Sequence, residues 1–373
     1  MTATAETVTD ALKSIKGPDG QDIVSSGKLS GVVVTGGKVF CSLTVDAAEA
    51  QRWEAVRKQA EETIKGLPGV VSVLIALTAE KKGGPAAPPP QRSGGPGMQP
   101  PGRAVQGVPG VKAIIAVASG KGGVGKSTTA VNLALGLQSL GLKVGVLDAD
   151  IYGPSMPRLL ALKGKPELIG GRTLKPMEAF GLKVMSIGFL VDEDTPMIWR
   201  GPMVQSAITQ MLREVDWAPL DVIVVDMPPG TGDAQLTLAQ QVPLAGAVIV
   251  STPQDLALID ARRGIAMFKR VDVPVLGLIE NMSYFLCPHC GERSDIFSHG
   301  GARHEAERWN VQFLGEVPLE LKIRELSDAG KPIVVSEPDG AYAKIYKDIA
   351  AKVRGALEGS GAKRAAPRIV IES

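Results

Sequence analysis

The sequence predicts an α/β fold with a doubly wound, mostly parallel sheet, preceded by a small α+β domain on a flexible linker. From residue 111 onward, short continuous apolar runs alternate with helical segments, and a glycine-rich loop joins the first run to a helix. Continuous apolar strands are typical of sheets that are covered on both faces. A stretch rich in Pro and Gly at 81–110 separates the first eighty residues from this larger domain.

Residues 1–80 have the pattern of a small α+β domain. Two apolar strands are joined by Thr35–Lys38, a turn typical of a hairpin, and apolar residues at helical spacing follow. Cys41 lies inside the second strand, where a lone cysteine is more often a small buried hydrophobe than a ligand. The predicted elements are a helix at 6–15, strands at 29–34 and 39–45, a helix from Trp53 to Ile64 and a strand at 70–76.

The segment 81–110 has the composition of a tether. Sixteen of its thirty residues are Gly or Pro. Such a segment has too few apolar side chains to form a core. We therefore expect a disordered linker here, a large folded domain at 111–358, and a flexible tail at 359–373.

The large domain contains seven candidate strands. Because ligands of doubly wound sheets bind at the carboxyl ends of the strands, the residues that follow these runs are the candidates for chemistry. A final amphipathic helix is predicted at 341–357. The candidate strands are 114–118, 144–147, 183–187, 222–225, 247–251, 275–279 and 313–317.

Composition excludes several classes of protein. The net charge of +2 gives no electrostatic argument for a nucleic-acid partner. No apolar run approaches the ~18 residues of a membrane span, and the first residues lack the pattern of a signal peptide. The chain has only three cysteines, too few for a disulfide framework. We therefore expect a cytoplasmic protein with no membrane and no nucleic-acid partner.

The glycine-rich loop is the strongest chemical signal in the chain. It fits G-x-x-x-x-G-K-[ST], in which backbone N–H groups surround the phosphates of a nucleotide, and it lies between a strand and a helix as that motif requires. We expect Lys126 to contact the β- and γ-phosphates and the Ser127 hydroxyl to bind Mg²⁺. The predicted binding residues are Gly120, Lys121, Gly122, Gly123, Val124, Gly125, Lys126, Ser127 and Thr128.

Carboxylates end two other apolar strands. Asp148 and Asp150 close the second strand, and strand periodicity places them on the same side. Asp226 ends the run at 221–226 in the form of a Walker B motif, and a carboxylate there suits Mg²⁺. Gly230 lacks a side chain, so its N–H could approach a γ-phosphate. Together with the loop, these elements predict a P-loop NTPase domain that binds ATP and Mg²⁺.

A second lysine, Lys121, makes the loop resemble the deviant Walker A group of P-loop ATPases, which includes MinD, ParA and nitrogenase iron protein. In that group the early lysine reaches across a dimer to the partner's phosphates, so the resemblance implies this role for Lys121. It also implies that Asp150 orients or deprotonates the attacking water and that Asp148 lies near the magnesium shell. Asn281, at the end of another strand, stands where relatives place an adenine-contacting Asn.

Cys287 and Cys290 form a C-x-x-C pair, whose spacing lets two thiolates converge on one metal centre. Iron–sulfur clusters and structural zinc usually need four ligands, so the pair must be completed. Two chains could share a cluster, zinc could recruit His289, His299 or His304, or the pair could be a redox dithiol. The dimer implied by the lysine signature favours the shared cluster. The histidines are otherwise typical of surface or capping residues.

Taken together, these motifs resemble the Mrp/ApbC iron–sulfur cluster carrier proteins. The resemblance spans roughly residues 5–357. It is carried by the deviant loop, by Cys287–Gly291 after Asn281–Tyr284, and by the runs Asp148–Ser155 and Gly315–Leu319. It implies that residues 1–80 are a domain of the kind found in iron–sulfur assembly proteins.

The resemblance also implies a function. Such a protein is a homodimer that holds a [4Fe-4S] cluster between its subunits through Cys287 and Cys290. It receives the cluster from an assembly scaffold and passes it to apoproteins with slow ATP hydrolysis, in which Lys121, Lys126 and Asp150 would be catalytic. Two alternatives are a positioning ATPase of the MinD/ParA kind and an ATPase with a structural zinc site.

Overall fold

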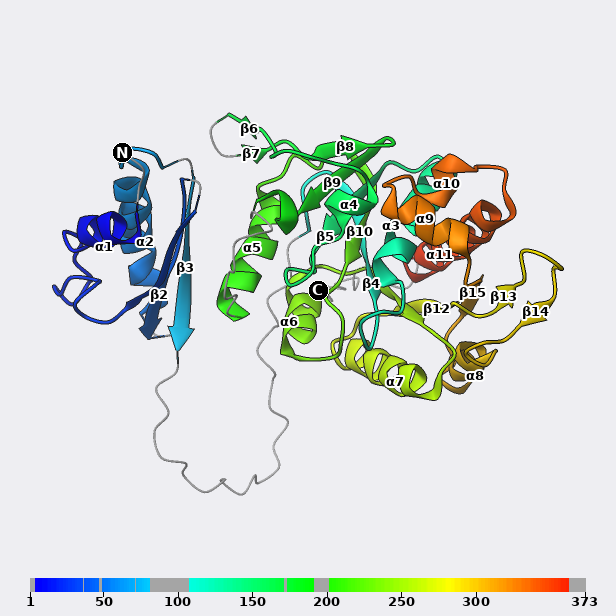
Figure 1. The fold of residues 1–373 in the computed structure, drawn as a ribbon. Coiled ribbons are helices and arrows are strands. Elements are labelled where there is room, and N and C mark those ends of the chain that lie inside the picture. Colours follow the sequence, from blue (N-terminus) through cyan, green and yellow to red (C-terminus); the bar gives the residue numbers. More distant parts are fainter. Residues whose placement is uncertain are drawn as a thin grey trace, which may run out of the picture. The chain divides into compact units, whose positions relative to one another are not determined.

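The computed structural model describes residues 4–35, 37–46, 49–70, 72–80, 107–170, 173–190 and 201–361. The chain divides into two compact units, one N-terminal and one much larger, and each is treated by itself (Figure 1). Most of the predicted linker, 81–106, and the end of the predicted tail, 362–373, lie outside the described residues.

The N-terminal unit is a three-stranded sheet with two helices. The hairpin strands are antiparallel, and α2 then carries the chain across so that β3 runs parallel to β2. Trp53, Leu12, Ile64 and Cys41 lie in its core. Burial raises the pKa of the Cys41 thiol to about 12, so the interpretation of Cys41 as a buried hydrophobe is confirmed. The elements are α1 (Ala5–Leu12), β1 (Leu29–Thr35), β2 (Lys38–Asp46), α2 (Ala50–Lys65) and β3 (Ser72–Glu80).

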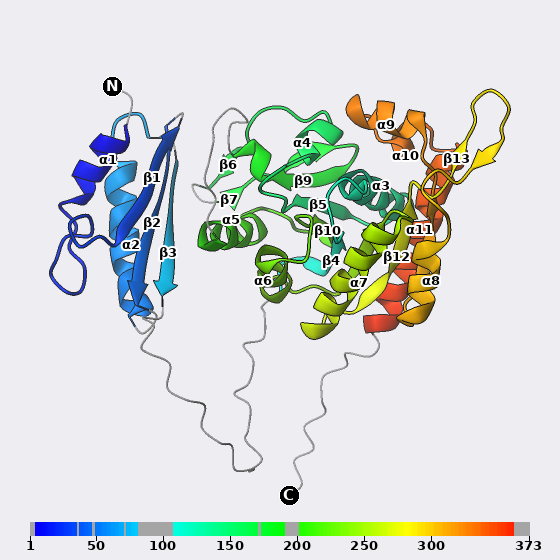
Figure 2. The ribbon, with the colours of Figure 1, turned by 60° about the horizontal axis from the view of Figure 1, so that its bottom comes forward.

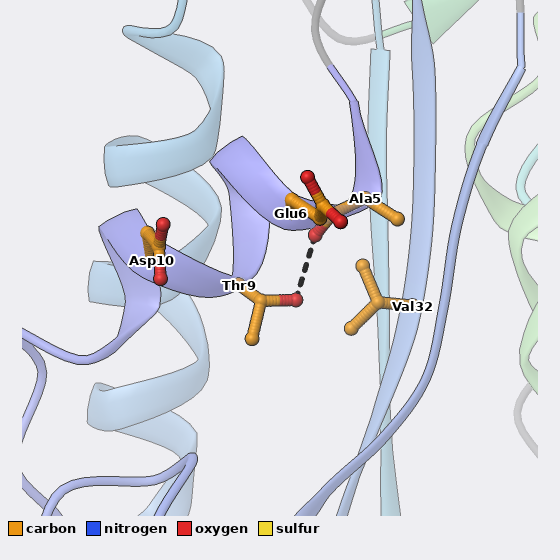
Figure 3. A pocket seen from close by; sticks show the side chains of 5 residues that line it. All are labelled: Ala5, Glu6, Thr9, Asp10 and Val32. Carbon is orange, nitrogen blue, oxygen red and sulfur yellow. Dashed lines mark hydrogen bonds between the residues drawn. The ribbon is translucent and has the colours of Figure 1, made fainter.

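Figure 3 shows a pocket on this unit, between α1 and β1. Its lining combines apolar groups with two carboxylates and a threonine, and the Thr9 hydroxyl donates to the Ala5 carbonyl at 2.7 Å. The lining contains no basic side chain and no cysteine, so it offers neither a phosphate site nor a thiolate site. The lining residues are Ala5, Glu6, Thr9, Asp10 and Val32.

The large unit is built on an eight-stranded sheet in the order β15-β12-β11-β4-β10-β5-β9-β8. All seven strands predicted from the apolar runs are present and parallel. The eighth, β8, pairs antiparallel with β9 at the edge and is only three residues long, too short for an apolar pattern to indicate. The strands are β4 (Val111–Ala118), β5 (Val144–Asp148), β8 (Met177–Ala179), β9 (Leu182–Ser186), β10 (Leu220–Asp226), β11 (Gly246–Ser251), β12 (Val275–Asn281) and β15 (Phe313–Val317).

Helices flank this sheet, so its strands are buried as the sequence predicts (Figures 1 and 2). The helices are α3 (Lys126–Ser139), α4 (Met156–Leu159), α5 (Gly201–Arg213), α6 (Asp233–Gln241), α7 (Asp255–Arg270), α8 (Gly301–Arg308), α9 (Leu321–Asp328), α10 (Ile333–Ser336) and α11 (Ala341–Gly361), with a 3-10 turn at Ile187–Phe189. Two short ribbons lie outside the sheet, β6 (Leu168–Ile169) with β7 (Thr173–Leu174) and β13 (Phe285–Leu286) with β14 (Arg293–Ser294).

Close packing of α3 and α11 fixes the helix that starts at the phosphate loop. A Cβ on Gly136 of α3 would lie 2.9 Å from Ala350 Cβ and 3.0 Å from the Tyr346 carbonyl oxygen on α11. The helix α11 continues to Gly361, past the predicted helix end at Leu357. Among the helices that the structure describes, none has the length and apolar character needed to cross a membrane.

Candidate functional site

The glycine-rich loop joins β4 to α3 and has the geometry of a phosphate cradle. Gly123 and Gly125 adopt φ of +81° and +77°, a left-handed conformation that glycine adopts without strain. The helix α3 begins directly after the loop at Lys126. Its first backbone N–H groups and its dipole therefore favour an anion at this point.

Neighbouring elements press against two glycines of the loop. A Cβ on Gly120 would lie 2.2 Å from the backbone carbon of Asp260 in α7, and a Cβ on Gly125 would lie 2.2 Å from Asn281 Nδ2. Both distances are far shorter than a van der Waals contact. Packing therefore favours glycine at both positions, and at Gly125 the left-handed backbone conformation favours it as well.

Lys126 lies at the centre of the predicted site. Its ammonium is buried and lies 2.5 Å from Asp226 Oδ1, 3.3 Å from Ser127 Oγ and 3.9 Å from Asp150 Oδ2. Burial raises the pKa of both carboxyls, and the Lys126 charge opposes that rise. The structure thus brings together four predicted residues from β10, α3 and the segment after β5.

The donor set suits Mg²⁺. Asp226 is fully buried, and its Oδ2 has no hydrogen-bond partner in the part of the chain that the structure describes. A buried carboxylate oxygen without a partner is costly unless a cation or water meets it. The Ser127 hydroxyl lies beside the same lysine, so Asp226 and Ser127 fit the hard-oxygen ligands that Mg²⁺ prefers.

Asp148 has a role that the sequence did not indicate. One oxygen accepts hydrogen bonds from the Ser155 and Met156 N–H groups at 3.0 and 3.1 Å and from Ser186 Oγ at 2.9 Å; the other accepts from the Asp150 N–H at 3.2 Å. Burial and repulsion from Asp226 raise its pKa to about 7. Asp148 therefore holds the loop that carries Asp150.

Three other predicted residues lie around the phosphate loop. The side chain of Lys121 forms no ion pair with the described residues, and its carbonyl accepts from Ser119 Oγ at 2.9 Å. The Gly230 N–H donates to the Ser119 carbonyl at 3.0 Å. Asn281 Nδ2 donates to the Val124 carbonyl at 2.8 Å. The proposed phosphate and adenine contacts of Gly230 and Asn281 remain predictions.

The C-x-x-C pair lies in the turn between β13 and β14. The Cys287 N–H donates to the Glu292 carbonyl at 2.9 Å and the Gly291 N–H to the Cys287 carbonyl at 2.8 Å, which closes the turn. Cys287 is half-buried and Cys290 is exposed. The N–H groups of Cys290 and His289 lower the pKa of the Cys287 thiol. The turn therefore favours the thiolate, the form that binds metals.

Among the residues that the structure describes, the cysteine pair has no third ligand within the chain. No group of three or more His, Cys, Asp or Glu side chains that could hold a metal occurs among the described residues. His299 lies near other partners, with Nδ1 2.8 Å from Arg293 Nη2 and 3.1 Å from Ser283 Oγ. His304 lies exposed on α8.

Sequence reasoning missed Glu280 and Ser186. Glu280 is fully buried at the end of β12, where its carboxylate accepts from the Gly300 and Ala302 N–H groups at 2.9 and 2.7 Å. Its signal was available, because a carboxylate at the end of an apolar parallel strand also identified Asp148 and Asp226. The contact of Ser186 with Asp148 had no signal, since a serine after an apolar run is common.

Comparison with known proteins agrees with this arrangement. The ParA family, described as NUBPL iron-transfer P-loop NTPase, matches residues 110–354, and an iron-sulfur cluster assembly protein family matches residues 5–75. The iron-sulfur cluster carrier protein of Synechocystis is 45% identical over 94% of this chain and 97% of its own length. The iron-sulfur cluster transfer protein NUBPL of Dictyostelium discoideum is 58% identical over 67% of this chain and 78% of its own.

Solved structures give the same fold. A nucleotide-binding protein from Archaeoglobus fulgidus in complex with ADP is 41% identical, with a TM-score of 0.56, over 63% of this chain and 92% of its own. The cell division ATPase MinD of Pyrococcus furiosus, 21% identical over 65% of this chain and 98% of its own with a TM-score of 0.50, shares the fold. The match over 110–354 covers well over half of the sequence. The chain therefore belongs to the ParA/NUBPL family of iron-transfer P-loop NTPases.

Proposed function

We propose that this protein is an ATP-dependent iron–sulfur cluster carrier that holds a [4Fe-4S] cluster between two identical subunits and transfers it to apoproteins. The observation that carries the proposal is the C-x-x-C turn itself. Its two thiols are accessible, the thiolate of Cys287 is favoured, and no third ligand joins them among the described residues. A [4Fe-4S] cluster takes four thiolates, and two copies of this turn supply four.

Exposed groups near the phosphate site support the homodimer. Leu256 is 73% exposed and Ile259 is 39% exposed, one turn apart on α7, and Tyr152 is 65% exposed in the loop after β5. These side chains follow strands on both sides of the phosphate loop, where Lys121 also lies without an ion-pair partner among the described residues. A second copy at this end of the sheet would cover the apolar groups and receive the lysine at its phosphates.

The chemistry of hydrolysis follows from the buried cluster around Lys126. The Lys126 ammonium would attract the negatively charged phosphate oxygens of ATP, and the N–H groups of the phosphate loop would donate hydrogen bonds to them. Ser127 and Asp226 would hold Mg²⁺, which would supply positive charge beside those oxygens. Asp150 has a pKa raised by burial, which suits a residue that orients and deprotonates water. We expect slow turnover, because cluster transfer needs a change of conformation more than sustained hydrolysis.

The names of the relatives support cargo transfer. The Synechocystis relative is named a cluster carrier, and the Dictyostelium relative a cluster transfer protein. The partners we propose are therefore a cluster-assembly scaffold that supplies the cluster and apo iron–sulfur clients that receive it. The zinc alternative is less well supported, because His299 is engaged with Arg293 and Ser283. The positioning alternative rests on structural neighbours whose likeness extends to the fold alone.

Anaerobic reconstitution with iron and sulfide tests the proposal. We expect thiolate-to-iron absorption and about one [4Fe-4S] cluster per two chains. Cys287→Ser and Cys290→Ser should each abolish the cluster, whereas Cys41→Ala, which removes the buried thiol, should keep it. Zinc in place of iron after reconstitution, or a full cluster in either Ser variant, would contradict the proposal.

A further inference from the structure

One side chain connects the phosphate loop to the strand that precedes the cysteine turn. Asn281, the last residue of β12, donates through Nδ2 to the Val124 carbonyl at 2.8 Å, and Gly125 packs directly against the same amide. Because this hydrogen bond and the close approach of Gly125 join the two segments, we expect a shift of the loop to shift the end of β12. Its neighbour Glu280 occupies the preceding position on the same strand.

Glu280 ties together both ends of the segment that contains the cysteine turn. Its Oε1 accepts from Ser283 Oγ at 2.7 Å, just before β13, and from the Gly300 N–H at 2.9 Å, just before α8. Its Oε2 accepts from the Ala302 N–H at 2.7 Å. The carboxylate is fully buried. The Glu280 side chain on β12 therefore holds the two ends of the segment 284–299 together.

His299 connects the end of this segment to the ribbon formed by β13 and β14. Its Nδ1 lies 2.8 Å from Arg293 Nη2 on β14, and Arg293 also stacks on the Tyr284 ring at 4.4 Å. A guanidinium only donates, so Nδ1 accepts in this contact, and Nε2 faces Glu316 Oε2 at 3.9 Å. Arg293 pairs with Leu286 across the ribbon, so His299 is connected through Arg293 to the strand next to Cys287.

We propose that Glu280 and His299 are positioning residues that transmit the state of the phosphate loop to the cysteine turn. A shift of Val124 would pass to Asn281 at the end of β12 and through its neighbour Glu280 to both ends of the segment 284–299. From there it would pass through His299 and Arg293 to β14. Neither residue needs to touch nucleotide or cluster. The inference rests on the proposed carrier function, since it concerns how nucleotide controls the cluster at Cys287 and Cys290.

The test compares cluster release with and without Mg-ATP. The reconstituted dimer is mixed with the ferrous chelator bathophenanthroline disulfonate, and the iron-release rates with and without nucleotide are expressed as a ratio. In the wild type we expect the two rates to differ by at least about fivefold, in either direction. In His299→Ala the ratio should fall to about one, although ATP hydrolysis and cluster content stay close to wild type.

Two variants separate positioning from general structure. His299→Asn keeps an acceptor oxygen for Arg293 and should restore the wild-type ratio, and His304→Ala removes an exposed histidine of α8 and should leave it unchanged. Where His299→Ala takes up no cluster, Arg293→Gln breaks the same contact from β14 and should give a ratio of about one.

The inference is overturned if His299→Ala shows the wild-type ratio of iron-release rates. If His299→Ala takes up no cluster, a wild-type ratio in Arg293→Gln overturns it instead. A ratio of one in the wild type also overturns it. Failure of the carrier function looks different. In that case the wild type takes up no cluster, or Cys287→Ser keeps one.

Discussion

The phosphate site and the cysteine turn differ in how much of the fold each uses. The phosphate site draws on the ends of β4, β5 and β10, and its Lys126, Asp148 and Asp226 are buried and paired with one another or with backbone groups. The cysteine turn lies on a ribbon of two-residue strands, with Cys290 exposed. The first site is built into the core of one chain, whereas the second, in the function that we propose, is half of a site shared by two chains.

This difference indicates what each site can do. Buried, paired charges hold one geometry, which suits phosphate chemistry. An exposed turn on a short ribbon can meet a second copy and release a cargo. Substitutions should therefore affect the stability of the fold strongly at the phosphate site and weakly at the cysteine turn.

The largest effect is expected from Lys126→Met. The change leaves Asp226 and Asp150 buried without their cation, which costs about 3 kcal/mol of unfolding free energy in comparable buried pairs. It also removes the charge that meets the phosphates, so ATP hydrolysis should fall by at least about a thousandfold. Denaturant unfolding of the nucleotide-free protein and phosphate release measure the two effects.

A surface lysine provides the matched control. Lys112 pairs with Asp221 at 2.7 Å, but its side chain is 79% exposed. Surface pairs of this kind contribute about 0 to 1 kcal/mol, so Lys112→Met should leave stability and hydrolysis nearly unchanged. Equal stability of the two variants would show that the buried cluster is not part of the core.

The next effect is a dependence of stability on pH that comes from Asp148. Burial and repulsion from Asp226 raise its pKa from an ordinary 3.8 to about 7. Between these values the folded protein binds more protons at Asp148 than the unfolded chain does, so its stability falls as pH rises. From pH 5 to 7.5 the wild type should lose on the order of 2 kcal/mol more than Asp148→Asn.

Denaturant unfolding of both proteins at the two pH values checks this prediction. The comparison removes the titration of Asp148 together with its repulsion of Asp226, while Asp150 and Asp226 are present in both proteins. If Asp148→Asn lost as much unfolding free energy as the wild type, a group other than Asp148 would be responsible for the pH dependence. A wild type that gains stability over this interval would contradict the direction of the shift.

The same contrast explains what could be predicted from the sequence. The strands of the large sheet were predictable because burial on both faces leaves continuous apolar runs. The phosphate loop was predictable because its glycines, Lys126 and Ser127 must occur at fixed spacing. The carboxylate of Asp226 was predictable because it ends an apolar run.

Contacts between distant segments left no such pattern. The bond from Asn281 to Val124 spans 157 residues, and a sequence contains no record of that approach. His299 is exposed, as expected for a surface residue, but its contacts with Ser283 and Arg293 depend on how the segment 283–299 folds and leave no pattern in the sequence. The three residues of β8 were too few to show any periodicity.

The smallest effect on stability is expected at the cysteine turn. Cys287→Ser and Cys290→Ser should each change the unfolding free energy of the cluster-free protein by less than about 0.5 kcal/mol, because both thiols are accessible and the turn is closed by backbone hydrogen bonds that serine retains. Denaturant unfolding without iron measures this. A loss comparable to that of Lys126→Met would mean that the turn supports the fold of one chain. A change near zero would mean that its thiols are free for a ligand shared with another.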